Sequence, residues 1–322
     1  MTATIYNEDC ITGLAERLAP DSVDLTISSI PFGALFQYSG KTEDIGNNAD
    51  GIDLRASQFG LHLRFMIAQL SRVQKPGTNV CIHIQQLIAT KAQHGFMGRR
   101  DLRAATIDLF GAGGFDWKGE IAIPKNPQVI AQRQKLHSLL FVTGRRDGRQ
   151  LAPAVNDYIL IFQLPGEAAP VPCLYDRHAN PGGWVTTDEW IRDAHGLWVD
   201  IREPDVLEGW QGGREEDDEK HVCPLQLEVV RRLVKLYSNP GELVLDPFAG
   251  IGTVPYVAVE QGRLAVGRAG ESGVRGKAPG FGKQGADLVG HGRRGCEEAA
   301  WPEGPSQPDA AGAPGGCRPP LQ

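Results

Sequence analysis

The fold is decided by the stretch Leu243–Thr253, which reads LVLDPFAGIGT. A short apolar run ends in an acid, and a loop broken by Gly250 and Gly252 follows. A helical pattern then continues through Val257 to Gln261. This order predicts a strand, a tight turn and a helix, and open α/β sheets bind their ligands where strands end. Glycines lack a Cβ atom, so a ligand can approach this loop closely.

A second stretch, Ser22–Phe32, reads SVDLTISSIPF and predicts another buried strand. The strand ends in the small polar residue Ser29, and Ile30, Pro31 and Phe32 follow it. Each of the two stretches alone is also compatible with an ordinary strand end before a turn. Their combination and their order along the chain are what point to a function.

Together the two stretches resemble the DNA amino-methyltransferases, which move a methyl group from S-adenosyl-L-methionine to an exocyclic base nitrogen. The first stretch is similar to the Asp-Pro-Phe-x-Gly-x-Gly-Thr cofactor motif of that family. The second is similar to its Ser/Asp/Asn-Pro-Pro-Tyr/Phe catalytic motif. The catalytic motif comes first, as in the permuted β class of bacterial and phage enzymes. The residues that match the cofactor motif are Asp246, Pro247, Phe248, Gly250, Gly252 and Thr253.

The resemblance implies a role for each residue of the catalytic motif. The hydroxyl of Ser29 and the backbone carbonyl of Ile30 would hold the target amino group, and Phe32 would stack on the base. Ile30 stands where the family usually has proline, but Pro31 still restricts it to extended conformations. Catalysis would then consist mainly of positioning and of preorganised electrostatics. Asp9 is either a helix N-cap or a residue near the adenine of the cofactor.

The resemblance also implies a fold, a Rossmann-like α/β domain that is circularly permuted around a mostly parallel sheet. The chain would start at the third strand, and the late cofactor strand would neighbour the catalytic strand. We expect residues 1–163 to form the catalytic part, 164–220 an irregular insertion that recognises the target, and 221–267 the cofactor-binding part. His221 would open the helix that precedes the cofactor strand.

Composition places limits on these expectations. The chain has 322 residues, 41% of them hydrophobic, enough for one large or two modest domains. No apolar run is long enough to span a membrane, and no signal peptide is evident, which favours the cytoplasm. Six scattered cysteines without Cys-x-x-Cys spacing do not suggest a metal or redox site.

The net charge of −6 does not favour nucleic acid as a partner. A local basic patch is nevertheless sufficient for such a partner. The densest basic region would serve phosphate contact; its members are Lys125, Arg133, Lys135, His137, Arg145, Arg146 and Arg149. The segment Lys91–Arg100 predicts a basic and aromatic loop, either near a nucleic acid strand or simply solvated.

The last part of the chain does not fit the family pattern. The strand that begins at Leu264 should end in an acid that binds the cofactor ribose, but Arg268 stands there. Residues 268–322 contain 13 glycines in 55 positions, which predicts a tail without stable packing. Our hypothesis is a frameshift near codon 267, and the missing acid would weaken cofactor binding.

The leading prediction is therefore a site-specific DNA methyltransferase that acts on cytosine N4 or adenine N6, with cytosine N4 slightly favoured by the Ser-x-Pro-Phe form. Double-stranded DNA would be its partner, and restriction-modification would link it to a cognate restriction endonuclease. The alternatives are an inactive DNA-binding remnant and a methyltransferase of RNA or small molecules.

Overall fold

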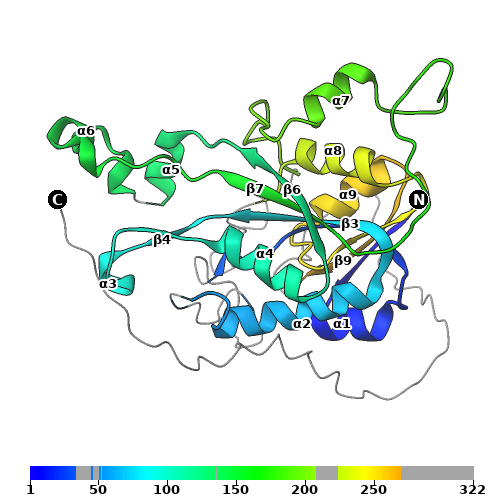
Figure 1. Ribbon diagram of the computed structural model, residues 1–322, viewed down its shortest axis with the longest axis horizontal. Helices are drawn as coiled ribbons and strands as arrows, with labels where there is room; N and C mark the ends of the chain where they lie inside the picture. The colour runs from blue at the N-terminus through cyan, green and yellow to red at the C-terminus, as the bar shows by residue number, and fades with distance from the viewer. Residues whose placement is uncertain (34–44, 46–50, 52, 135, 208–223, 270–322) are drawn as a thin grey trace, which may run out of the picture. The chain divides into compact units, whose positions relative to one another are not determined.

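The computed structural model describes residues 1–33, 45, 51, 53–134, 136–207 and 224–269. Its centre is a seven-stranded sheet in the order β1-β9-β8-β2-β3-β7-β6 (Figure 1). Neighbouring strands are parallel from β1 to β3, whereas β7 is antiparallel to both β3 and β6. The strands are β1 (Ala3–Asn7), β2 (Val23–Ser29), β3 (Gln74–Gln85), β6 (Asp116–Ile123), β7 (Asp157–Gln163), β8 (Leu243–Asp246) and β9 (Leu264–Ala269).

The order of the strands confirms the predicted permuted, mostly parallel α/β fold. The first strand of the chain, β1, lies at one edge of the sheet and pairs with β9, the last described strand. The cofactor strand β8 comes late in the chain but is central in the sheet. It lies beside the catalytic strand β2, with Leu25 opposite Val244 and Thr26 opposite Leu245.

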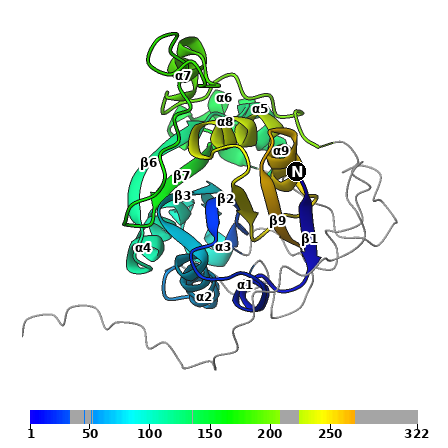
Figure 2. The ribbon, with the colours of Figure 1, turned by 90° about the vertical axis from the view of Figure 1, so that its right-hand side faces the viewer.

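Helices cover both faces of the sheet (Figures 1 and 2). The helices α1 (Cys10–Arg17), α2 (Gln58–Val73) and α4 (Leu102–Ala112) share one hydrophobic core. The helices α8 (Leu227–Tyr237) and α9 (Thr253–Glu260) contribute to a second core on the other face. Buried side chains recur along α2 at helical spacing, so one stripe of the helix faces the sheet; they are Phe59, Leu63, Met66, Ile67, Leu70 and Val73.

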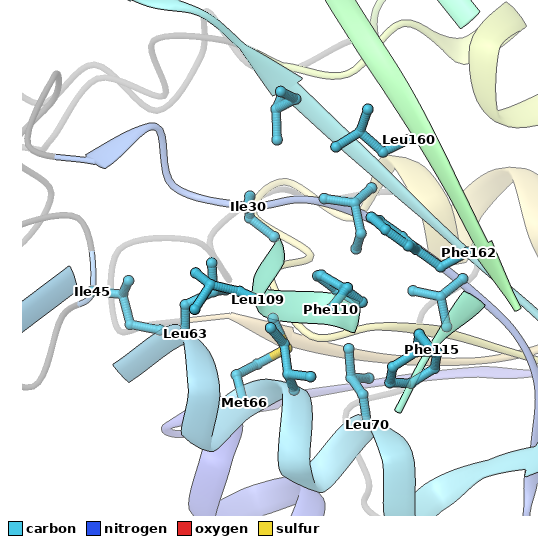
Figure 3. Close-up of a cluster of buried hydrophobic side chains, with 14 of the residues drawn as sticks. Ile30, Ile45, Leu63, Met66, Leu70, Leu109, Phe110, Phe115, Leu160 and Phe162 are labelled. Carbon is cyan, nitrogen blue, oxygen red and sulfur yellow. The ribbon is translucent and has the colours of Figure 1, made fainter. Parts of the chain in front are cut away.

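The first core contains a residue of the catalytic motif. Ile30 points into the cluster that Figure 3 shows, among side chains of α2, α4 and β7. Phe110 stacks on Phe162 with ring centroids 4.3 Å apart and meets Phe115 edge-on at 5.4 Å. Interiors of this kind are close-packed, so a side chain held among such neighbours has little freedom. The packing of Ile30 therefore fixes the backbone that follows Ser29.

Two projections extend beyond the end of β3 (Figure 1). The first is a hairpin of β4 (Leu87–Ala89) and β5 (Gly98–Arg100) that carries α3 (Lys91–His94). The predicted loop over residues 91–100 is therefore wrong, because Thr90 caps a short helix and Gly95 ends it in a left-handed conformation. The second projection, residues 124–156, is called the arm; it contains α5 (Pro127–Arg133), η3 (His137–Leu139), α6 (Phe141–Arg146) and η4 (Gly148–Gln150).

The predicted insertion is described over residues 164–207 and carries α7 (Thr187–Asp193). Trp198 is only 1% exposed, belongs to the second core and donates its indole N–H to the carbonyl of Asp193 at 3.1 Å. Trp184 donates to the carbonyl of Lys235 in α8 at 2.9 Å. These two tryptophans therefore attach the segment to α8 and the sheet. Residues 208–223, including His221, lie outside the described part, and the helix predicted from His221 is observed from Leu227.

The cofactor half ends slightly later than predicted. The strand β9 runs to Ala269, and Arg268 within it is fully buried, so the predicted unpacked tail does not begin at 268. Residues 270–322 lie outside the described part. Among the helices that the structure describes, none has the length and apolarity that crossing a bilayer requires.

Candidate active site

Both sequence motifs lie at the carboxyl-terminal ends of the parallel strands, where β2, β3, β8 and β9 end. Ser29 is the last residue of β2, and Asp246 is the last residue of β8. The hydroxyl of Ser28 donates to Oδ1 of Asp246 at 2.7 Å in a buried hydrogen bond. The structure therefore places the catalytic and cofactor motifs next to each other, as the sequence predicts.

Asp246 is a buried acid rather than a surface carboxylate. It is 3% exposed, and Oδ1 accepts hydrogen bonds from Ser28 and from the backbone N–H of Phe248 at 3.0 Å. Burial penalises the charged form and raises the pKa of Asp246 to about 7, although both hydrogen bonds act in the opposite direction. Asp246 thus shapes the turn after β8 and is partly neutral near neutral pH.

The glycine loop after Asp246 has the backbone that the sequence predicts. Gly250 and Gly252 have φ values of +50° and +89°, in the left-handed region that favours glycine. Gly252 donates its N–H to the carbonyl of Ala249 at 2.7 Å, and Thr253 begins α9. A Cβ atom on Gly252 would meet Ile5 of β1 at 3.0 Å. Gly252 therefore serves the turn and the packing against Ile5, and close approach of a ligand to this loop stays a prediction.

The side chains of the catalytic motif are fixed by burial and by contacts with His83. The hydroxyl of Ser29 lies 2.8 Å from Nδ1 of His83. Ile30, Pro31 and Phe32 are all buried, with Phe32 3% exposed. The Phe32 ring meets His83 edge-on at a centroid distance of 5.6 Å. Because this ring is already covered, stacking on a target base would require it to be uncovered; that role stays a prediction.

A buried polar network that the sequence analysis did not identify lies behind Ser29. Nε2 of His83 is 3.1 Å from Oδ2 of Asp157, an ion-pair contact that is not aligned as a hydrogen bond. Nζ of Lys125 reaches the same oxygen at 2.6 Å, and the amide of Gln85 donates to Oδ1 at 2.8 Å. The signal in the sequence was the presence of His83 and Asp157 within apolar strands.

The network controls the charge of Asp157. Burial alone would raise the pKa of its carboxyl, but the interactions with His83 and Lys125 outweigh burial, and the pKa is lowered. Lys125 is 8% exposed at its side chain. Its predicted role in phosphate contact is therefore wrong, because its ammonium group is committed to Asp157.

Asp9 lies after β1, next to the cofactor half of the sheet. Its Oδ1 accepts a hydrogen bond from the backbone N–H of Thr12 at 2.8 Å and so caps α1. The helix-cap alternative is therefore confirmed, while contact with the cofactor adenine stays a prediction.

Arg268 occupies the end of β9, where the resemblance implies an acid. Its guanidinium contacts Glu8 and lies 4.7 Å from the ring centroid of Tyr6. Burial lowers the pKa of Arg268 to about 10. No guanidinium nitrogen of Arg268 has an aligned hydrogen-bond partner among the described residues. Glu8 also pairs with Arg17 at 2.8 Å, so its carboxylate is shared between two cations.

The described residues thus match the cofactor motif at the glycine loop but not at the end of β9, where the ribose of S-adenosyl-L-methionine is expected. The glycine loop has the left-handed backbone of the cofactor motif, whereas Arg268 places a buried cation where the resemblance implies an acid that binds the ribose. Within the described residues, no group of three His, Cys, Asp or Glu side chains could hold a metal ion.

Comparison with known families identifies the chain. The family model described as DNA methylase, for N6 and N4 methyltransferases, matches residues 23–272. The match covers most of the chain and includes both motifs. It ends four residues beyond Arg268, close to the break that the sequence indicates. The chain belongs to this DNA methylase family.

Two curated relatives agree with the family. The type II methyltransferase M.MthZI of Methanothermobacter thermautotrophicus is 25% identical over 207 residues, 62% of this chain and 52% of that protein. The type II methyltransferase M1.MboII of Moraxella bovis is 40% identical over 47 residues, 15% of this chain and 18% of that protein. The chain therefore matches about half the length of the first relative and less of the second.

Two solved structures share the fold. The TTHA0409 protein of Thermus thermophilus, in complex with S-adenosyl-L-methionine, has a TM-score of 0.58 and 21% identity, over 84% of this chain and 90% of that one. The PvuII DNA methyltransferase, described as cytosine-N4-specific, has a TM-score of 0.54 and 14% identity, over 84% and 83%. At these identities the likeness establishes a Rossmann-like methyltransferase fold.

Proposed function

We propose that the protein transfers a methyl group from S-adenosyl-L-methionine to an exocyclic amino group of cytosine or adenine in double-stranded DNA. The observation that carries the proposal is that Ser28, the residue before Ser29, bonds to Asp246 at the ends of the neighbouring strands β2 and β8, which brings the two motifs together. Membership of the DNA methylase family supports the same reaction. We favour cytosine N4, because the motif has serine in place of an acid.

Ser29 and Ile30 would hold the acceptor nitrogen through the Ser29 hydroxyl and the Ile30 carbonyl. Gly250 and Gly252 would take the amino-acid end of the cofactor, whose sulfonium supplies the methyl group. An amino nitrogen on a base is a weak nucleophile because its lone pair is delocalised into the ring. Fixing its two hydrogens aims the lone pair at the methyl, so the contribution of the chain is positioning. The target base must first leave the duplex, which costs a few kcal/mol.

The arm supports a polynucleotide substrate over a small molecule. Three exposed arginines lie on α6 and η4 of the arm, which projects beyond the end of β3 (Figure 1); they are Arg145, Arg146 and Arg149. Exposed apolar side chains, Phe141 and Val142, lie on the same helix. A basic surface of this kind neutralises phosphates, so it compensates locally for the net negative charge of the chain.

The test is transfer of a labelled methyl group to unmethylated genomic DNA, followed by nucleoside analysis of the product. We expect label in N4-methylcytosine or in N6-methyladenine. The Ser29→Ala variant should lose at least about 100-fold in rate, a typical loss for an interaction made in the transition state. Label in RNA alone would overturn the choice of DNA. Modified DNA that resists a nuclease encoded beside the gene would support a cognate restriction endonuclease.

A second candidate, an inactive DNA-binding remnant, is favoured by one observation, the buried Arg268. Titration with S-adenosyl-L-methionine separates the two candidates. Saturable binding supports the enzyme, whereas DNA binding without cofactor binding supports the remnant.

A further inference from the structure

The hydroxyl of Ser29 contacts an imidazole, that of His83, which can accept a proton during the reaction. Ser29 lies 2.8 Å from Nδ1 of His83, and Nε2 of the same ring lies 3.1 Å from Asp157. The three side chains come from adjacent strands, β2, β3 and β7. In the sheet, Ser29 is opposite His83, and Asp157 is opposite Gln85. A hydroxyl, an imidazole and a carboxylate therefore follow one another from the end of β2 into the protein, each within 3.1 Å of the next.

We propose that His83 is a positioning residue that acts through Ser29 and accepts the proton released by the target amino group, while Asp157 holds the imidazole in the required orientation. The proposal rests on the proposed function, because it assumes that Ser29 meets the amino group.

The reaction produces a proton that needs an acceptor. The amino nitrogen forms a bond to the methyl carbon while the carbon–sulfur bond breaks and leaves its electron pair on sulfur. The nitrogen is then cationic and must lose one proton. The oxygen of Ser29 takes that proton while its own hydroxyl proton moves to Nδ1 of His83. Ser29 is unchanged at the end, and one proton resides on the imidazole until solvent removes it.

The groups around His83 determine which of its two ring nitrogens carries the proton and which keeps a lone pair. Asp157 is ionised, because His83 and Lys125 hold the pKa of its carboxyl low despite burial. An ionised carboxylate attracts an N–H and repels a lone pair, so the Nε2 atom 3.1 Å from it carries the ring proton even though the two groups are not aligned as a hydrogen bond. Nδ1 is then left with its lone pair directed at the Ser29 hydroxyl. A carboxylate behind the ring also stabilises the imidazolium that forms when Nδ1 takes up a proton.

The other groups around His83 are compatible with this role. Lys125 contacts Asp157 at 2.6 Å and limits the negative charge that faces the ring. Gln85 and the edge of Phe32 are uncharged. His83 is 3% exposed, so its ring is largely shielded from bulk water. Asp246, which titrates near neutral pH, interacts with Ser28 rather than with His83.

The first experiment is the pH dependence of single-turnover methyl transfer at saturating cofactor and DNA. The imidazole must be neutral to accept a proton, so the rate of the wild-type protein should rise with pH, as general-base catalysis requires. In His83→Gln the amide can still bond to Ser29 but cannot take up a proton. We expect a rate about 100-fold lower at pH 8, loss of the rise that His83 causes, and unchanged cofactor affinity.

Two comparisons make this result specific. Asp246 is present in both proteins, so the difference between their profiles reports His83 alone. His62→Gln, in α2, is the matched control and should keep the wild-type rate and profile. A His83→Gln profile that rises as in the wild-type protein would overturn the proposal.

The second experiment does not require methyl-transfer activity. Histidine-selective ¹⁵N labelling of the full chain reports which ring nitrogen of His83 carries the proton. We expect protonation at Nε2 at pH 8, and a shift of the Nδ1 resonance in Ser29→Ala because its partner hydroxyl is lost. Protonation at Nδ1 at pH 8 would overturn the proposal even in an active protein. If the wild-type protein transfers no methyl group but Nε2 is protonated, the proposed function fails and the orientation of His83 stands.

Discussion

Ser28 and Asp246 share a buried hydrogen bond of 2.7 Å although 218 positions separate them in the chain. This bond joins the end of the catalytic strand to the last residue of the cofactor strand. A buried hydroxyl and a buried carboxyl satisfy each other here, which avoids the penalty of an unpaired polar group. The relative positions of the two motifs therefore depend on this pair of side chains, on the bond from the Leu243 backbone N–H to Asp24 at 2.9 Å, and on the sheet pairing of β2 with β8.

The first prediction concerns pH and Asp246. Its pKa is about 7 in the folded protein, above the ordinary value of 3.8, so the folded state retains a proton that the unfolded state releases. Stability should therefore fall as pH rises from about 4 to 7 and level off above that. Three units at about 1.4 kcal/mol each set an upper limit of about 4 kcal/mol. Urea unfolding at pH 5 and pH 8 measures the effect, and Asp246→Asn should abolish this component; an equal slope in both proteins would contradict it.

The second prediction concerns Arg268. Replacing it by glutamate restores an acceptor at the end of β9, and Arg17 remains to balance Glu8. We expect Arg268→Glu to bind S-adenosyl-L-methionine at least about tenfold more tightly, about 1.4 kcal/mol. Calorimetric titration measures this affinity. Arg268→Met is the control for loss of the cation alone and should gain less; equal gains in the two variants would mean that no carboxylate is needed.

The frameshift hypothesis has a test of its own. If the tail after codon 267 results from a shifted frame, another frame of the gene should encode an acid followed by an amphipathic helix at this point. Translation of the gene in its other frames is sufficient to decide. A gene without a Glu-Leu-x-x-Ser/Tyr helix in any frame would establish the glycine-rich tail as genuine.

The third prediction concerns the arm. Changing Arg145, Arg146 and Arg149 together to glutamine should weaken DNA binding and reduce its salt dependence. Each lost phosphate contact lowers the slope of log K against log salt by about 0.9, so we expect a change of up to about 2.7. Arg177→Gln and Arg202→Gln, both exposed outside the arm, are the matched controls. Titrations at several salt concentrations in which all variants share one slope would show that the arm does not contact phosphates.

The fourth prediction concerns two tryptophans of the same segment. Trp198 is 1% exposed, donates to Asp193 and lies 5.0 Å from the guanidinium of Arg232, whereas Trp190 is 46% exposed. We expect Trp198→Ala to lower the free energy of unfolding by about 3–5 kcal/mol. Trp190→Ala, as the control, should change it by less than about 0.5 kcal/mol. Denaturant unfolding compares them; equal losses would mean that the segment does not pack as described.

Sequence reasoning located the sheet and the two motifs because strand ends carry local signals. The apolar runs before Ser29 and Asp246 predict neighbouring parallel strands, and the glycines mark the loop between β8 and α9. The network of His83, Asp157 and Lys125 was missed for a physical reason. It depends on the antiparallel register of β7 beside β3, which short isolated runs do not specify. Lys125 was assigned to the surface because its buried partner is 32 positions away.

The pairing of β1 with β9 has a consequence for how the molecule assembles. Ala3 meets Ala265, so this edge closes over 262 positions of chain. The entropy of closing a loop grows slowly with length, but pairings so distant in sequence slow folding. During synthesis β1 must therefore wait until β9 has been made before it can pair, and until then its backbone stays open to association with other chains.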